Sequence, residues 1–260
     1  MSRTLAAGLL MLVAATARVD AQQSAPRRSG SADMSPSLQA MQLDRATNPA
    51  MLWVQQGHEL WQAAPNDAAP SALTCASCHG AVEVSMRGVA ARYPAWDDLG
   101  RKPLNLSQRI NECRIRHQRA APWRAESPAL LALESLVAYQ SVGMPIAPQK
   151  EQRLTLFVQR GEALFQARLG QLNLSCANCH EERAGLRLGG NVIPQAHPTA
   201  YPVYRLEWQG LGSLQRRLRN CMHGVRAQAY PFGADELVAL ELYLAKRAAG
   251  MPLEAPGVRP

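Results

Sequence analysis

Cys75-Ala-Ser-Cys-His79 and Cys176-Ala-Asn-Cys-His180 are two copies of the pattern C-x-x-C-H in a chain of 260 residues. This pattern is the attachment site of c-type haem, because its cysteines form thioethers with the haem vinyl groups and its histidine is placed to bind the iron. A redox-active cysteine pair or a structural zinc site would leave the repeated histidine unexplained. The sequence therefore predicts two haem c groups, held covalently by Cys75, Cys78, Cys176 and Cys179, with His79 and His180 as iron ligands.

The sequence around these motifs is repeated in the same order. Val54-Gln-Gln-Gly57 returns as Val158-Gln-Arg-Gly161, and Gly143-Met-Pro-Ile146 returns as Gly250-Met-Pro-Leu253. A lone cysteine, Cys113 and then Cys221, lies between these landmarks in each copy. Landmarks kept in order indicate duplication of a whole domain. We predict an all-α fold of two tandem cytochrome c-like domains, residues 50–147 with haem 1 and residues 148–260 with haem 2.

Helical patterns in each copy support this fold class. Apolar residues recur at helical spacing before each haem motif, over 52–61 and 154–165. Ser127-Pro128 is typical of the N-cap and first residue of a later helix, which we expect to stop at Gly143 and Pro145. Its counterpart begins near Asp235 and stops at Gly250. We interpret Met144 and Met251, inside these stops, as packing residues.

The N-terminus has the pattern of an exported protein. Arg3 precedes an apolar run over 5–15, and Val19-Asp20-Ala21 is a small-residue cleavage site. We predict a signal peptide over 1–21, with an uncleaved anchor as the alternative, and a loosely packed N-terminal arm rich in Ser, Ala, Pro and Gln over 22–49. The apolar run is too short for stable membrane insertion, and no later run reaches the ~18 apolar residues of a membrane span. Since bacteria attach c-type haem outside the cytoplasmic membrane, we expect a periplasmic location.

The chain is basic, with a formal net charge of +8. A basic balance can indicate nucleic acid as a partner, but an exported haem protein argues against it. A small anionic substrate or an acidic protein partner is the better expectation.

The lone cysteines are our candidates for the second axial ligand of each iron. Met144 and Met251 lie beyond the last helix of their copies, whereas Cys113 and Cys221 lie before it in matching frames, Arg109-Ile-x-x-Cys113 and Arg217-Leu-x-x-Cys221. A disulfide between the two cysteines is the alternative. Equivalent positions in duplicated domains would more naturally face their own haems.

Arginines surround the second lone cysteine more densely than the first. Residues 215–226 contain Arg216, Arg217, Arg219 and Arg226 without an acid, whereas Glu112 offsets the arginines near Cys113. Arg217 lies one helical turn before Cys221, on the same face. Positive surroundings favour a thiolate, although such a run can also be a solvated helix face, and the residues alone leave both interpretations open.

With these motifs in view, the chain resembles the SoxA family, the catalytic cytochrome subunits of bacterial thiosulfate-oxidising complexes. The likeness covers residues 50–260. It rests on both C-x-x-C-H motifs, on Arg217-x-x-x-Cys221, on Gly224-Val-Arg226, and on the tail Pro256-Gly-Val-Arg-Pro260. Family members with one haem lack the first motif, so this chain resembles the dihaem type.

The resemblance implies an enzyme, an L-cysteine S-thiosulfotransferase, that couples thiosulfate oxidatively to a cysteine of a SoxYZ-like carrier protein. A SoxX-like monohaem cytochrome would be its partner in a heterodimer, and haem would accept the electrons. Cys113 would bind the iron of haem 1 and Cys221 that of haem 2. Cys221 would also be the catalytic cysteine, carrying a persulfide, and Arg217 would bind the substrate. Arginine presents a fork of donors that suits the oxygens of a small dianion.

Three other functions compete with this one. A thiosulfate dehydrogenase would form tetrathionate without a carrier, but the absence of a long insertion between the domains and the tail motif favour the SoxA family. A dihaem electron-transfer cytochrome would use both cysteines only to tune the haem potentials. A dihaem peroxidase is a weaker third, because it needs a five-coordinate haem and each copy offers a sixth ligand.

Overall fold

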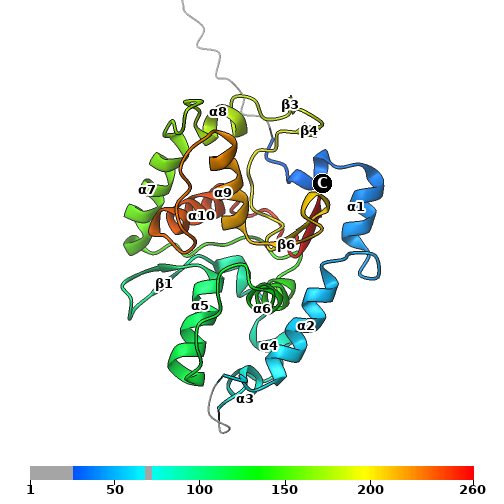
Figure 1. The fold of residues 1–260 in the computed structure, drawn as a ribbon, viewed down its shortest axis with the longest axis vertical. Coiled ribbons are helices and arrows are strands. Elements are labelled where there is room, and N and C mark those ends of the chain that lie inside the picture. The colour runs from blue at the N-terminus through cyan, green and yellow to red at the C-terminus, as the bar shows by residue number, and fades with distance from the viewer. Residues whose placement is uncertain (1–25, 68–71) are drawn as a thin grey trace, which may run out of the picture.

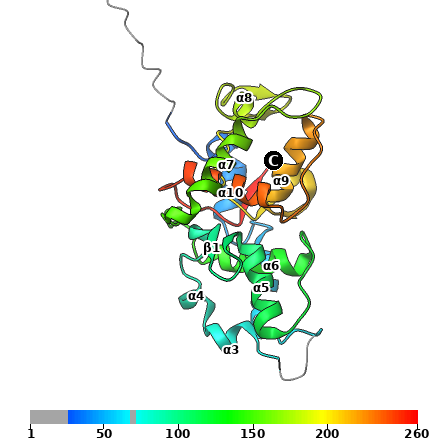
Figure 2. The same ribbon diagram turned by 90° about the vertical axis from the view of Figure 1, so that its left-hand side faces the viewer.

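The computed structural model describes residues 26–67 and 72–260, so the predicted signal peptide lies outside the described residues. Two lobes follow one another along the long axis of the molecule (Figures 1 and 2). We call residues 51–139 lobe 1 and residues 155–247 lobe 2. In the part of the chain that the structure describes, no helix is both long and apolar enough to cross a membrane.

A pair of packed helices forms the framework of each lobe. In lobe 1, α2 (Met51–Gln62) packs against α6 (Pro128–Tyr139), and in lobe 2, α7 (Thr155–Gln166) packs against α10 (Asp235–Arg247). The apolar stripes predicted from the sequence form the two cores, one including Val54, Trp61, Leu133 and Leu136, the other Phe165, Leu237, Leu240 and Leu244. These four predicted helices are confirmed, although α6 and α10 end several residues before the glycines expected to stop them. Ser127 occupies the N-cap of α6 without making a capping hydrogen bond.

A glycine lets the two helices of each pair approach closely. A Cβ atom on Gly57 would lie 2.8 Å from the Cβ of Leu136, and one on Gly161 would lie 2.7 Å from the Cβ of Tyr243. The same added atoms would also collide with the backbone carbonyls of Ala132 and Ala239. The repeated Val-Gln-x-Gly segment is therefore the helix crossing point in both lobes.

The fold is mainly helical, but the prediction of an all-α fold missed three small sheets. Strands β1 (Ala95–Asp97) and β2 (Lys102–Leu104) form a hairpin in lobe 1, and β3 (Arg187–Leu188) and β4 (Asn191–Val192) form another in lobe 2. The third sheet has the order β6-β5-β7, with β5 (Val203–Arg205) between β6 (Gly210–Gly212) and the C-terminal strand β7 (Gly257–Arg259). Strands of two or three residues are too short to show a period of two.

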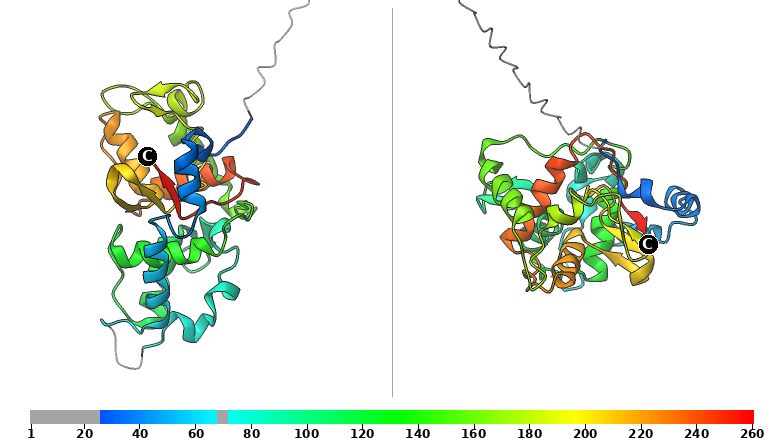
Figure 3. Two further views of the ribbon diagram at one scale, coloured as in Figure 1. Left: turned by 90° about the vertical axis from the view of Figure 1, so that its right-hand side faces the viewer. Right: turned by 90° about the horizontal axis from the view of Figure 1, so that it is seen from above.

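Residues 26–49 of the N-terminal arm pack against the C-terminal segment, so the prediction of a loosely packed arm is wrong for this part. Helix α1 (Pro36–Leu43) lies beside β7 (Figure 3, left). Met34 and Leu38 pack against Val258, and Glu254 accepts hydrogen bonds from Ser29 and Ser31. Composition hid these anchors, because the arm offers few apolar residues and its partners lie more than 200 positions away.

The repeated Gly-Met-Pro segments join the two lobes. Both glycines have a positive φ, 77° at Gly143 and 85° at Gly250. The segments run antiparallel to each other, with Gly143 N donating to Leu253 O at 2.8 Å and Ile146 N donating to Met251 O at 2.9 Å. Ile146, Met251 and Leu253 are buried in one apolar cluster with alanines of α6 and α10.

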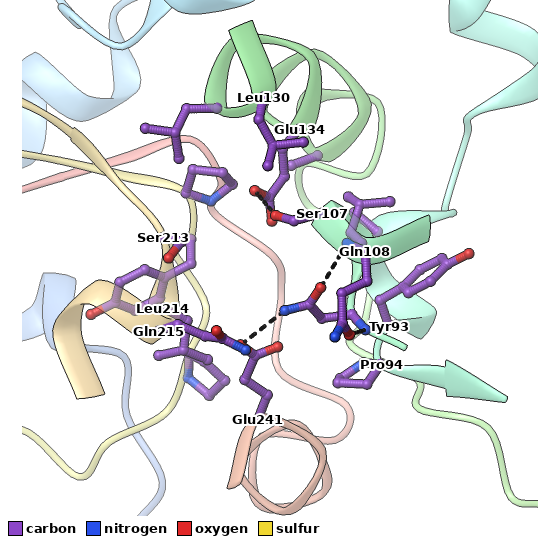
Figure 4. A pocket seen from close by; sticks show the side chains of 18 of the residues that line it. Tyr93, Pro94, Ser107, Gln108, Leu130, Glu134, Ser213, Leu214, Gln215 and Glu241 are labelled. Atoms are coloured by element: carbon purple, nitrogen blue, oxygen red, sulfur yellow. Dashed lines mark hydrogen bonds between the residues drawn. The ribbon is translucent and has the colours of Figure 1, made fainter. Parts of the chain in front are cut away.

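A cavity of about 310 Å³ lies between the lobes and is lined by residues from both (Figure 4). Glu134 of α6 and Glu241 of α10 face into it. Ser107 donates a hydrogen bond to Glu134 at 2.5 Å, and Asn105 donates one to Glu241 at 3.2 Å. Burial raises the pKa of Glu134 to about 7 and that of Glu241 to about 8.

Replacing Gly161 by alanine is expected to destabilise lobe 2. The added methyl group would collide with Ala239 and Tyr243, and overpacking of this kind costs about 1–3 kcal/mol. The control is Gly224→Ala, since no heavy atom lies within 4 Å of a Cβ there. Thermal and denaturant unfolding of the haem-loaded variants provides the measurement. Equal stability of Gly161→Ala and wild type would contradict the tight crossing.

The two buried glutamates are expected to make the protein less stable as the pH rises from about 4.5 to about 8. In this window the folded state keeps protons that the unfolded state, with carboxyl pKa values near 4.5, has released. Glu134→Gln and Glu241→Gln remain neutral, so their stability relative to wild type should increase between pH 5 and pH 8.5. Unfolding midpoints at each pH test this, with the exposed Glu162→Gln as control. A difference that does not change with pH would contradict it.

Candidate haem and anion site

The second C-x-x-C-H motif forms a short, well-capped helix, α8 (Cys176–His180). The Ser175 hydroxyl accepts a hydrogen bond from Asn178 N at 3.2 Å, and the Asn178 side chain accepts one from Ser175 N at 3.0 Å. His180 closes the helix, and its Nδ1 lies 2.7 Å from the carbonyl oxygen of Pro194. A histidine that donates through Nδ1 presents the lone pair of Nε2 to a metal.

Cys221 faces this histidine from α9 (Leu214–Gly224). Burial raises the pKa of the Cys221 thiol, but a hydrogen bond with His180 and the positive charge of Arg217 outweigh burial, and the net shift is downward. His180, Cys221 and Arg217 all line one cavity of about 500 Å³. The structure therefore brings together the histidine, cysteine and arginine that the sequence singled out in the second copy.

The arginines of α9 do not form a solvated face. Arg216 stacks on Trp208 with its guanidinium carbon 4.2 Å from the ring centroid, and Arg219 bonds to the Tyr230 carbonyl and stacks on Phe232. Arg217 is the member of the run that lines the cavity. Among the described residues, no carboxylate forms a salt bridge with Arg217.

The first copy places its haem motif and its lone cysteine on equivalent helices, but the charges around the cysteine differ. Its motif forms α3 (Cys75–His79), where the Trp61 indole donates to the Gly80 carbonyl at 3.0 Å and its ring centroid lies 5.7 Å from that of His79. Cys113 ends α5 (Leu106–Cys113), and burial is the main cause that raises the pKa of its thiol.

The arginines beside Cys113 are paired with acids. Arg109 and Arg116 bind the buried carboxylate of Asp97 at 2.9 Å and 3.6 Å, and Arg116 also binds Glu112 at 2.7 Å. Glu112 offsets the positive charge of the arginines near Cys113 as predicted, and Asp97 contributes a second negative charge.

Two of the alternatives that the sequence left open gain no support from the structure. All six cysteines are free, so the structure contains no disulfide between Cys113 and Cys221. A structural zinc site needs four ligands. Within residues 26–67 and 72–260, no three His, Cys, Asp or Glu side chains are grouped as metal ligands.

Sequence reasoning missed three arginines that line the cavity around Cys221. Arg187 begins β3, Arg205 ends β5 and Arg259 ends β7, and all three lie on the cavity wall with Arg217. Arg259 belongs to the tail motif, to which no role in the site was assigned. Arg205 lies 16 positions before Cys221, outside the arginine run over 215–226, and only alignment of the two copies would have pointed to it.

These residues fit a c-type haem in lobe 2. Helix α8 presents two cysteines and an oriented histidine, and α9 supplies a soft sulfur donor that faces the histidine. Arginines on the cavity wall provide positive charge for the carboxylates that a haem carries. A cytochrome haem needs one histidine and one further axial ligand, which is the donor set found here.

A mainly helical fold with two C-x-x-C-H helices, and with a lone cysteine facing the histidine of the second motif, defines the class of the c-type cytochromes. The family model described as "SoxA/TsdA, cytochrome c domain" matches residues 56–146 and 160–253, one segment in each lobe. The chain belongs to this SoxA/TsdA cytochrome c family.

Named relatives and a solved structure agree with this placement. The chain is 35% identical over 217 residues to the L-cysteine S-thiosulfotransferase subunit SoxA of Pseudaminobacter salicylatoxidans, covering 83% of this chain and 75% of the relative. It is 33% identical to the subunit of the same name from Rhodovulum sulfidophilum, covering 89% and 80%. A chain in the crystal structure of SoxXA from P. pantotrophus matches with a TM-score of 0.85 at 32% identity, covering 90% of this chain and 87% of that chain.

Proposed function

We propose that this protein is the SoxA-type subunit of an L-cysteine S-thiosulfotransferase. It couples thiosulfate to a cysteine thiol of a carrier protein. The balanced reaction joins the terminal sulfur of thiosulfate to the carrier sulfur, releases one proton, and delivers two electrons to the enzyme. The observation that carries the proposal is the meeting of His180, Cys221 and Arg217 on one cavity wall, where no carboxylate among the described residues forms a salt bridge with Arg217, in a chain similar to enzymes of this name.

Cys221 is the proposed catalytic residue and carries a persulfide. The outer sulfur of the persulfide releases its proton and bonds to the terminal sulfur of thiosulfate while two electrons leave. The carrier thiol then attacks this same terminal sulfur, takes the thiosulfate group, and returns its proton to the persulfide. Arg217 holds the sulfonate oxygens during both steps, because its guanidinium can bind two oxygens at once and lies one turn from Cys221.

The proposed dihaem arrangement follows the two copies. Cys75 and Cys78 would hold haem 1 covalently, with His79 and Cys113 as ligands of its iron, and Cys176 and Cys179 would hold haem 2, with His180 and Cys221 as ligands. Bound haem c supplies the acceptor for the two electrons. We assign residues 50–147 and 148–260 to the two domains, in line with the duplicated helix pairs.

A SoxX-like monohaem cytochrome is the proposed partner in a heterodimer, and a SoxYZ-like protein is the proposed carrier. The support for the first is the similarity to a chain of SoxXA from P. pantotrophus. The proposed location is the periplasm, after removal of residues 1–21, because the N-terminal pattern and the haem motifs both indicate export.

Replacement of Cys221 by methionine is expected to abolish formation of the carrier-bound thiosulfonate. Methionine can still bind the iron of haem 2 through its thioether sulfur, so a low-spin spectrum should remain, but it has no thiol that can hold an extra sulfur. Intact mass of the carrier after incubation with thiosulfate and an electron acceptor measures the product. Carrier modification at the wild-type rate would disprove the covalent mechanism and favour an electron-transfer cytochrome.

The same reaction mixtures separate the two enzyme functions. Omitting the carrier should stop thiosulfate consumption by the wild-type protein. Tetrathionate formation without the carrier would instead identify a thiosulfate dehydrogenase.

Replacement of Cys113 by alanine is expected to change the spectrum of one haem and leave most of the thiosulfate turnover. Asp97 and Glu112 neutralise the arginines around this cysteine, so haem 1 lacks the positive surroundings of haem 2. Carrier modification rates and the visible spectrum of the same sample check this. Complete loss of turnover with haem 2 intact would make haem 1 essential and overturn the auxiliary role.

A further inference from the structure

The two lobes share one continuous frame from the strand hairpin to the lone cysteine. Residues 93–113 of lobe 1 correspond without a gap to residues 201–221 of lobe 2. Both frames contain a Tyr-Pro pair, a hairpin of two three-residue strands in the same register, a capped helix N-terminus, and the Arg-x-x-x-Cys segment. Each residue of the first frame therefore has a counterpart 108 positions later.

One buried position in this frame has opposite charge in the two lobes. Asp97 ends β1, and its carboxylate binds Arg109 at 2.9 Å and accepts a hydrogen bond from Gly100 N at 2.6 Å. Its counterpart is Arg205, which ends β5 and is only 9% exposed. The counterpart of Arg109 is Arg217. Lobe 1 thus pairs a partly exposed arginine with a buried carboxylate where lobe 2 has two arginines.

Arg205 and Arg217 of lobe 2 are not fully neutralised by carboxylates among the described residues. One Nη of Arg205 binds the half-exposed carboxylate of Glu207 at 2.7 Å, but its buried Nε has no hydrogen-bond partner among the described residues. Burial, and next the positive charge of Arg217, lower the pKa of Arg205. Two like charges facing a shared cavity raise the free energy of the folded protein unless an anion binds between them.

We infer that Arg205 is a second substrate-binding arginine, acting with Arg217 on the sulfonate oxygens of thiosulfate beside Cys221. The inference rests on the proposed function and deepens it. A sulfonate group has three oxygens, so it can accept hydrogen bonds from two guanidinium groups at once. In lobe 1 the carboxylate of Asp97 already occupies the equivalent place as a resident anion. The exchange of aspartate for arginine then determines which of two similar cysteines receives thiosulfate.

The test uses the haem-loaded protein in complex with its cytochrome partner, and measures KM and kcat for thiosulfate with the carrier present. Arg205→Gln removes the charge and keeps the side-chain length, and it should raise KM about 10- to 100-fold, the range of one charge-assisted hydrogen bond. Arg205→Asp installs the lobe 1 residue, which should pair with Arg217 and raise KM further. Arg205→Lys should recover part of the loss. The visible spectrum and reduction potential of haem 2 should stay close to wild type in Arg205→Gln.

Arg216→Gln is the matched control, because it removes one positive charge from the neighbouring residue of α9, which stacks on Trp208 and does not line the cavity. Its KM should stay within about 2-fold of wild type, as expected for a partly screened charge without a substrate contact. An equal rise in KM for Arg216→Gln and Arg205→Gln would mean that only the overall field matters, and would overturn the inference.

The inference about Arg205 would also be overturned if Arg205 contacted a haem carboxylate and not the substrate. If Arg205 served a haem carboxylate alone, Arg205→Gln would shift the haem 2 spectrum or potential and leave KM unchanged. Failure of the proposed function is distinguishable from both outcomes, because the wild-type complex would then form no carrier-bound thiosulfonate at all. If Arg205→Asp does not fold, the KM of Arg205→Gln alone decides the question.

Discussion

The close crossing of two helices at a single glycine is the constraint on which each lobe depends. Gly57 and Gly161 let the carbonyl-bearing face of the partner helix approach within van der Waals contact. The haem-motif helices are attached to these pairs, since Trp61 of α2 bonds to Gly80 after α3, and Phe165 of α7 packs with Ala177 of α8. A side chain at the crossing would separate the helices and move the cysteine-histidine helix away from the lone cysteine that faces it.

Duplication also gave the molecule its interface between lobes. Because each copy ends in Gly-Met-Pro, the two segments can pair with each other and bury their apolar residues in a shared cluster. The same duplication placed Glu134 and Glu241 on one cavity, where neither meets a lysine or arginine among the lining residues. Apolar packing at the Gly-Met-Pro segments therefore has to offset the cost of burying two carboxyl groups.

Helical periodicity revealed the four framework helices because each has apolar residues at regular spacing over about three turns. The hairpins were missed because strands of two or three residues are too short to show a period of two. Strand β7 and the packed arm were missed because their partners are distant in the chain. In the site, the proximity of Arg217 and Cys221 on one helix could be predicted from their spacing in the sequence. The position of Arg205 beside them could not, because it depends on how a strand packs near the helix. The 108-residue offset between the copies nevertheless identifies Arg205 as the counterpart of Asp97.

The difference between the lobes lies in the residues around the cysteines more than in the cysteines themselves. Each lobe has a motif helix, a lone cysteine and an arginine one turn before it, so these parts alone cannot separate a reactive site from an inert one. What differs is whether the arginine already has an anion. In lobe 1 the buried carboxylate of Asp97, 2.9 Å from Arg109, is a permanent anionic partner for that arginine. In the inferred arrangement of lobe 2, the anionic partner of Arg217 is a molecule from solution. The cavity beside Arg217 gives that anion a place to bind.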